Sequence, residues 1–270
     1  MTKSIRMMED AIKTVDAIIY VLDSRAAFSC LNPVLNDLCK DKPIVYALNK
    51  ADLISKIDLD IILKTLKADG KAVIALNSTA SKTALVLASE IKKLCEERLS
   101  RLAARGIKAV TRAMVIGIPN SGKSTLINNL HGSAAATTGN KAGVTRGKQW
   151  IKINPYFEVI DTPGTLYPKL KNQDKARRLA YIGSINDDIL DKQWLALELI
   201  SELDKLNSEF ISQRYKIENG NAEIRLLGIA KSRGFIKKGG EADELKGASA
   251  LIDDFRKGRL GKIALETADI

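Results

Sequence analysis

The chain has 270 residues, enough for about two domains, and its apolar fraction of 45% with charges of both signs excludes a disordered polypeptide. No apolar run reaches the roughly 18 residues of a membrane-spanning helix. Lys and Arg exceed Asp and Glu by 43 − 32 = 11, which favours a polyanionic partner, although an inert basic surface would give the same count.

Six short apolar runs predict β-strands. Most are β-branched and nearly continuous, as in strands covered on both faces of a mostly parallel sheet. The runs are Ile18–Asp23, Pro43–Asn49, Ala72–Asn77, Ala113–Ile118, Gln149–Ile153 and Phe157–Asp161. Helical patterns alternate with them at Ile5–Val15, Leu31–Lys40, Asp58–Ala68, Ser81–Ala104 and Lys123–Leu130. This alternation predicts right-handed βαβ units and a doubly wound α/β domain.

The pattern changes after about Lys171, where helical stretches predominate and basic residues fill the connections. The predicted helices are Asp174–Ile182, Leu190–Leu206, Ser208–Tyr215, Ala222–Lys231 and Ala248–Lys257, with one short possible strand at Lys262–Glu266. We therefore predict an α/β domain over residues 1–170 and a small all-α domain over residues 171–270.

A phosphate-binding loop is predicted at Gly117–Ser124, which reads GIPNSGKS and matches GxxxxGK[ST]. Its glycines let successive backbone N–H groups point at phosphates, and the following helix presents its positive end to the same anion. Lys123 is expected to reach the β- and γ-phosphates, and the Ser124 hydroxyl to bind Mg²⁺. An apolar strand before the loop and a helical pattern after it support the match.

Two further motifs are placed to complete a magnesium site. Asp161–Gly164 reads DTPG at the end of a predicted strand, where Asp161 would hold Mg²⁺ through a water and the Gly164 N–H would bond the γ-phosphate. Thr145, in the AGVTRG segment between the two loops, is the candidate for a second hydroxyl ligand. Ser124, Thr145 and Asp161 offer the oxygen ligands that Mg²⁺ prefers.

The stretch YALNKADLI predicts a guanine-reading loop at Asn49–Asp52. The Asp52 carboxylate would accept hydrogen bonds from guanine N1–H and the 2-amino group, which adenine does not offer in that arrangement. Lys50 would lie along the base, and Asn49 would tie loops together. One strand later, backbone N–H groups of Asn77 and Ser78 are candidates for contacts to the base oxygen.

These motifs follow the usual order of a GTPase, cut and reopened after DTPG. If the strand that leads into the phosphate loop is numbered one, as in a conventional GTPase, the strands occur along this chain in the order four, five, six, one, two, three. We therefore predict a circularly permuted P-loop GTPase domain, with a mostly parallel six-stranded sheet and helices on both faces.

The chain resembles the ribosome biogenesis GTPase A family, also called YlqF. Specific features besides the GTPase loops are VLDSR with a following NP, GVTRG, DTPGTLYPK, YIGSINDDILD, KSRGF and a closing FRKGRLGKI. The resemblance implies a GTPase that assists late assembly of the large ribosomal subunit, with the helical domain contacting ribosomal RNA. It also implies a protein of the cytoplasm, away from membranes and monomeric when free.

The resemblance assigns nucleotide contacts and catalytic roles residue by residue. Asn120 resembles the asparagine that binds K⁺ in potassium-stimulated GTPases, where K⁺ supplies the charge of an arginine finger. Lys123, Thr145 and Gly164 are the expected catalytic group. The full nucleotide-binding set is Asn49, Lys50, Ala51, Asp52, Asn77, Ser78, Asn120, Ser121, Gly122, Lys123, Ser124, Thr125 and Gly164.

Two departures from the family pattern predict slow intrinsic hydrolysis, completed by the ribosomal subunit. Thr165 follows DTPG, where many GTPases have a water-positioning glutamine and this family an apolar residue. The family's PGHM-like segment, whose histidine is proposed to aid hydrolysis, has no counterpart here. The single histidine, His131, is expected to end the helix after the phosphate loop at the surface.

Three alternatives stay open from the residues. A small-subunit assembly GTPase would carry a zinc-binding Cys/His cluster or an oligonucleotide-binding barrel, and neither pattern occurs in the sequence. A non-enzymatic RNA-binding module would use GTP only as a structural ligand, and an ATP-using P-loop enzyme would show no guanine selectivity. Cys30, Cys39 and Cys95 form no CxxC pair, so we expect buried, reduced thiols.

Overall fold

The computed structural model describes residues 3–80, 83–132, 150–166 and 172–266. All six predicted strands are present, with ends within two residues of the prediction. They are β1 (Ala17–Asp23), β2 (Ile44–Asn49), β3 (Ala72–Ala75), β4 (Thr111–Gly117), β5 (Trp150–Asn154) and β6 (Phe157–Asp161).

The strands form one sheet in the order β3-β2-β1-β4-β6-β5. Every neighbouring pair is parallel except β5 and β6, which are antiparallel and form one edge. The chain enters the middle of the sheet at β1, builds outward to β3, and returns to the middle at β4. The strand order is therefore the one that the permuted arrangement predicts: β4, the strand that leads into Gly117–Ser124, lies beside β1, although more than eighty residues separate them in the chain.

Helices cover both faces of this sheet because side chains alternate along each strand. On β1, Ile18, Tyr20 and Leu22 lie in the apolar cluster of one face, whereas Ala17, Ile19 and Val21 lie in the cluster of the other. The first face is covered by α1 (Lys3–Ile12), α2 (Pro33–Cys39) and α3 (Lys56–Ala68), and the second by α4 (Thr83–Leu94) and α6 (Lys123–His131).

The predicted helix Ser81–Ala104 is in fact two helices, α4 and α5 (Glu96–Ala103), that meet at Cys95. The backbone of Cys95 departs from helical geometry, with φ −100° and ψ 5°. Its side chain is buried in the apolar cluster that α4 and α6 form with the sheet. The helical periodicity continues across this break, so the pattern alone predicts a single helix. All three cysteines are free and buried, as expected.

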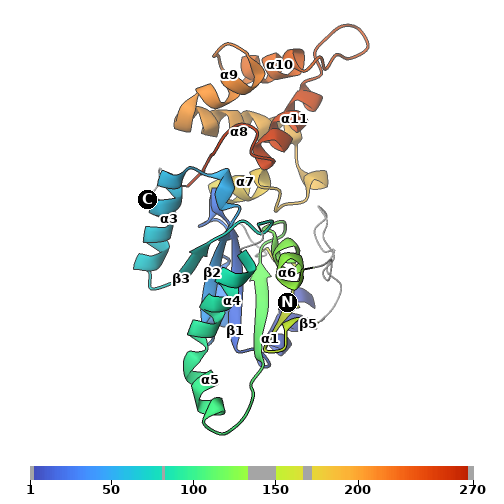
Figure 1. Cartoon of the computed structure of the whole chain (residues 1–270). Coiled ribbons are helices and arrows are strands. Elements are labelled where there is room, and N and C mark those ends of the chain that lie inside the picture. Colours follow the sequence, from blue (N-terminus) through green and yellow to red (C-terminus); the bar gives the residue numbers. More distant parts are fainter. Residues whose placement is uncertain (1–2, 81–82, 133–149, 167–171, 267–270) are drawn as a thin grey trace.

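Five helices stack beyond the carboxyl ends of the parallel strands (Figure 1). They are α7 (Gln173–Tyr181), α8 (Lys192–Asn207), α9 (Glu209–Tyr215), α10 (Ala222–Ser232) and α11 (Glu244–Arg256), called here the helical end. Leu199 of α8 and Leu251 of α11 belong to the same apolar cluster as Ile18 of the sheet. The apolar core therefore continues from the sheet into the helical end.

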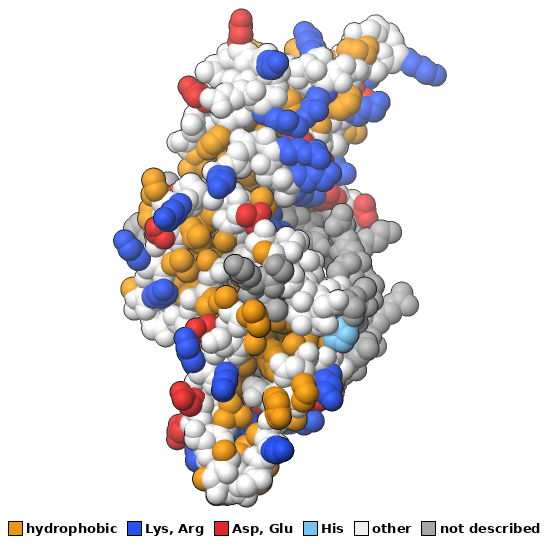
Figure 2. Space-filling model, viewed as in Figure 1, with side chains coloured by type: hydrophobic (Ala, Val, Ile, Leu, Met, Phe, Trp, Pro, Cys, Tyr) orange, Lys and Arg blue, Asp and Glu red, His pale blue; other side chains and the backbone are white. Residues whose placement is uncertain are grey.

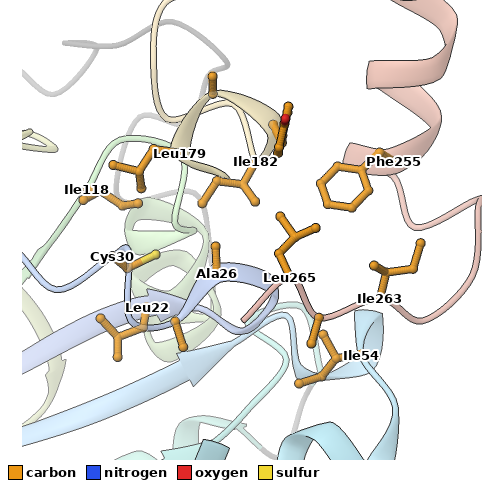
Figure 3. Packing of buried hydrophobic residues seen from close by; sticks show 14 of the residues in the cluster. Leu22, Ala26, Cys30, Ile54, Ile118, Leu179, Ile182, Phe255, Ile263 and Leu265 are labelled. Carbon is orange, nitrogen blue, oxygen red and sulfur yellow. The ribbon is translucent and has the colours of Figure 1, made fainter. Parts of the chain in front are cut away.

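The closing residues return from α11 to the α/β part. Ile263 N–H donates to the Leu53 carbonyl at 3.0 Å, and Leu265 N–H to the Arg25 carbonyl at 2.8 Å. The prediction of a possible strand at Lys262–Glu266 is therefore wrong: the segment makes single backbone bonds to two separate 3₁₀ turns, Ala51–Leu53 and Ser24–Ala26, and does not join the sheet. Figure 3 shows Ile263 and Leu265 lying between Ile54 and Phe255, which seals the junction with apolar contact.

None of the helices within the described ranges is both long and apolar enough to cross a bilayer.

Candidate functional site

The phosphate loop follows β4 and wraps tightly against the guanine-reading loop. Gly122 has φ +99°, a region that side chains disfavour, and a Cβ there would lie 2.2 Å from Asn49 Nδ2. Gly122 is followed directly by α6, whose first turn carries Lys123, Ser124 and Thr125. The loop therefore presents backbone N–H groups and a helix N-terminus at the same point, which suits a phosphate.

Lys123 is buried, and its ammonium donates to the Ile118 carbonyl at 2.8 Å. Burial lowers its pKa to about 8, and nearby Asp161 opposes the shift. A phosphate is the kind of partner that favours the charged form of such a buried lysine. The neighbouring Ser121 hydroxyl donates to the same carbonyl at 3.0 Å, so Ile118 fixes both side chains.

Two of the side chains predicted to bind Mg²⁺ come together from two loops. Ser124 Oγ donates to Asp161 Oδ2 at 2.9 Å, which brings the phosphate-loop hydroxyl and the DTPG carboxylate together. A hydroxyl and a carboxylate are ligands that suit this hard cation. Thr145, the third predicted ligand, lies outside the described residues.

Asn49 joins three loops. Its Nδ2 donates to the Ser121 carbonyl at 2.8 Å, and its Oδ1 accepts from the Ser78 N–H at 2.9 Å. The Asn77 side chain accepts from the Thr79 N–H instead, which shapes the turn after β3. Asn49 thus holds the phosphate loop and the turn at Asn77–Ser78 against the carboxyl end of β2.

Lys50 adopts a left-handed backbone conformation, with φ +57°. Its ammonium donates to the Asn120 carbonyl at 3.0 Å and pairs with Asp23 at 2.8 Å. Ala51 and Asp52 follow in a short 3₁₀ turn, and Ala51 N–H donates to the Leu76 carbonyl. The Asp52 side chain is exposed rather than buried.

The Asp23–Arg25 pair is a part of the site whose role the sequence did not reveal. Both side chains are buried, and Arg25 donates to Asp23 through Nε at 2.9 Å and Nη2 at 2.7 Å. Arg25 Nη1 also donates to the carbonyls of Phe255 and Arg256 at the end of α11. Asp23 therefore links Lys50 of the guanine-reading loop to the helical end. The signal in the sequence was a charged pair directly after a wholly apolar strand.

A second contact joins the phosphate loop itself to the helical end. Asn120 Nδ2 donates to the Gly183 carbonyl at 2.5 Å, and Ser184 Oγ donates to the Pro119 carbonyl at 2.8 Å. Gly183 and Ser184 form the turn after α7, inside the YIGS stretch. The loop expected to bind phosphate therefore rests directly on the turn that begins the helical end.

Gly164 of the DTPG motif packs against the phosphate loop. A Cβ there would lie 2.6 Å from Pro119 Cα and 2.9 Å from Lys123 Nζ. The following Thr165 N–H donates to the Gly117 carbonyl, and the Thr165 carbonyl accepts from Asn32 Nδ2. His131, by contrast, is exposed at the far end of α6 from the loop.

We expect Gly164→Ala to weaken GTP binding by roughly 10- to 100-fold, because the backbone of Pro119 must move to admit the methyl group, an overpacking cost of about 1–3 kcal/mol. Titration of a fluorescent GTP analogue measures the change. Gly220→Ala is the matched control, since its Cβ would meet only the flexible Ile224 side chain. Wild-type affinity in Gly164→Ala would show that DTPG does not approach the phosphate loop as described.

Comparison with known proteins decides the family. The chain is 35% identical over 272 aligned residues to ribosome biogenesis GTPase A from Bacillus cereus, an alignment that covers 100% of this chain and 92% of the relative. The Bacillus licheniformis protein of the same name is 34% identical, with 98% and 95% covered. The chain belongs to the ribosome biogenesis GTPase A family. Membership makes it a GTPase that binds guanine nucleotides, as the loops indicate.

The family fold is also found in solved structures. GDP-bound YlqF superposes with a TM-score of 0.70 at 24% identity, covering 97% of this chain and 99% of that one. GNP-bound YlqF from T. maritima gives a TM-score of 0.67 at 23% identity, with 98% and 97% covered. A family model described as a 50S ribosome-binding GTPase matches residues 112–223. That match begins in β4 and omits Asn49–Asp52, which precede the phosphate loop in this chain.

Proposed function

We propose that this GTPase acts in assembly of the large ribosomal subunit, and that residues 171–270 form the domain that contacts the particle. The contact between Asn120 and Gly183, together with that between Ser184 and Pro119, carries this proposal, because it joins the nucleotide loop to the helical end, where residues 231–262 carry nine Lys and Arg against five Asp and Glu. The family model described as 50S ribosome-binding supports the choice of subunit.

In the proposed reaction the protein positions GTP and stabilises developing charge. Lys123 holds the β- and γ-phosphates, and the Gly164 N–H faces the γ-phosphate. Ser124, Asp161 and Thr145 would hold Mg²⁺, and the ion would supply positive charge beside the phosphate oxygens. Asn120 is the proposed K⁺ ligand, and Asp52 reads the base. The nucleotide-binding, metal and catalytic roles predicted from the sequence are all retained in this proposal.

We further propose that GTP controls the helical end. The chain runs from Gly164 into α7, so a rearrangement around the γ-phosphate would act on the helical end through the chain itself. The bonds at Gly183 and Ser184 provide a second route, since they hold the phosphate loop directly. The free protein is proposed to be a cytoplasmic monomer that engages the particle in its GTP form.

Co-sedimentation with purified large and small subunits tests the proposal, using GDP and a non-hydrolysable GTP analogue. We expect binding to the large subunit that is stronger with the analogue. Hydrolysis, measured in K⁺ and in Na⁺ buffers, should be slow alone, faster with large subunits and faster in K⁺. Binding to small subunits instead would favour the small-subunit alternative. Subunit binding without any hydrolysis would favour an RNA-binding module with structural GTP.

A further inference from the structure

A buried carboxylate on α11 gathers three arginines at the surface of the helical end. Asp254 is only 2% exposed. It accepts hydrogen bonds from Arg214 Nε at 2.9 Å, Arg233 Nη2 at 2.6 Å and Arg259 Nη1 at 3.0 Å. The arginines come from α9, the end of α10 and the residues after α11. We call Arg214, Arg233 and Arg259 the arginine triad.

The triad is held in place, yet it stays accessible. Its side chains are 32%, 37% and 48% exposed, in chain order. Each guanidinium has five N–H donors and gives one to Asp254. Arg233 also stacks 5.2 Å from the centre of the Tyr215 ring, and Tyr215 donates to Asp254 at 3.0 Å. The triad therefore loses little side-chain entropy when it binds a ligand.

Another arginine in the same unit shows what a structural role looks like. Arg225 is 1% exposed and donates to Asp204, the Ser208 carbonyl and the Ser212 hydroxyl. There a single arginine faces a single carboxylate, and the Arg225 side chain is itself shielded from solvent. In the triad, three guanidinium groups share Asp254, and Arg259 additionally lies 3.6 Å from Asp253. A contact that only held the helices together would not need three guanidinium groups around one carboxylate.

The triad lies in a wider basic surface. Residues 231–262 contain nine Lys and Arg against five Asp and Glu. Between α10 and α11 the chain forms a small hairpin, closed by a bridge between Ile236 and Ala242, with Lys237 and Lys238 exposed near its tip. Figure 2 shows Lys and Arg side chains gathered over α11 and the neighbouring connection.

We propose that the arginine triad is a preorganised binding site for the phosphate backbone of RNA. The forked guanidinium group matches phosphate oxygens in pairs, and the fixed spacing of three forks suits phosphates that are themselves joined along one strand. The hairpin lysines extend the contact along that strand. This assignment rests on the proposed function for its partner, ribosomal RNA, and adds the residues that bind it.

The test compares variants that remove the same charge in two places. Arg214, Arg233 and Arg259 are changed to Gln together. The matched control changes Lys92 and Lys93 of α4 and Arg105, just after α5, to Gln; both helices lie away from the helical end (Figure 1). The probe is a fluorescein-labelled RNA hairpin of mixed sequence, titrated at several salt concentrations. Because each phosphate contact contributes about 0.7–0.9 to the slope of log affinity against log salt, the triad variant should lose about 2 units of slope, and the control less than about 0.5.

A second variant distinguishes loss of RNA binding from unfolding, and thermal melting shows whether each variant is folded. Changing all three arginines to Lys keeps the charge beside Asp254 but removes the forks. It should retain the salt slope and lose roughly tenfold in affinity. Wild-type affinity and slope in both folded triad variants would overturn the triad site and leave the proposed function standing. If the wild-type chain binds neither the hairpin nor large subunits, both proposals fail; binding to phosphatidylglycerol vesicles alone would overturn the RNA assignment.

Discussion

Replacing Asp52 by Asn is expected to weaken GTP binding roughly 100- to 1000-fold and to strengthen binding of xanthosine triphosphate. In the proposed site the Asp52 carboxylate would accept from two guanine donors, and an amide in its place would turn one acceptor into a donor, at a cost of about 3–4 kcal/mol. Xanthine carries an oxygen where guanine has its 2-amino group, so it suits the amide. Competition between the two triphosphates for a fluorescent GTP analogue measures the exchange.

Asp60→Asn is the control for this exchange, because Asp60 is also an exposed carboxylate but lies on α3. It should leave the affinities for GTP and for xanthosine triphosphate within about twofold of the wild-type values, as expected for a surface change away from the site. Unchanged GTP affinity in Asp52→Asn would mean that the base is read by other residues.

Replacing Arg25 by Met is expected to lower the free energy of unfolding by about 3–5 kcal/mol. This is the usual cost of removing one partner of a buried ion pair, because the other charge stays buried without it. The change leaves buried Asp23 with Lys50, and it removes the guanidinium that binds the last carbonyls of α11. Urea unfolding measures the loss. Arg101→Met is the control, since its pair with Glu97 is 69% and 87% exposed, and it should cost less than about 1 kcal/mol.

The pH dependence of stability separates the charge effect from lost packing. Burial alone would raise the pKa of Asp23, but Arg25 and Lys50 hold it well below the ordinary value of 3.8. The stability that this charged carboxylate contributes is therefore complete above pH 3.8 and is lost as the pH falls toward the lower folded value. Without Arg25 the pKa of Asp23 in the folded state should rise toward 3.8, so the loss of stability on acidification should be smaller and should be complete at a higher pH. Adding Asp23→Asn to Arg25→Met should recover part of the stability, whereas a further loss would show that packing dominates.

Most of the fold could be predicted from the residues because local pattern and local chemistry agree in the α/β part. Uninterrupted apolar runs predict strands covered on both faces, and β1 is buried along its whole length. Errors arose where periodicity alone was used. The helical pattern continues through Cys95, where the helix breaks, and the short apolar run near Ile263 binds a turn instead of joining the sheet.

The loop motifs could be predicted because each one is short and contiguous. Gly117–Ser124 needs glycines at fixed offsets, and Gly122 indeed has a positive φ. The contacts of Asp23, Ser184 and Asp254 could not be predicted in the same way. Asp254 meets Arg214 across 40 residues, and Arg25 meets Phe255 across 230. No periodicity or local spacing encodes a partner at that distance.

The sequence by itself determined the GTPase loops, their permuted order and the alternation of strands and helices, because these depend on neighbours in the chain. Only the tertiary structure decided which side chains connect the nucleotide loops to the helical end. Asp23 lies between Lys50 and Arg25, and Ser184 reaches Pro119, because the core packs the helices over the carboxyl ends of the strands. Charged groups buried at that junction must find partners, and the packing of the whole chain sets which partners are within reach.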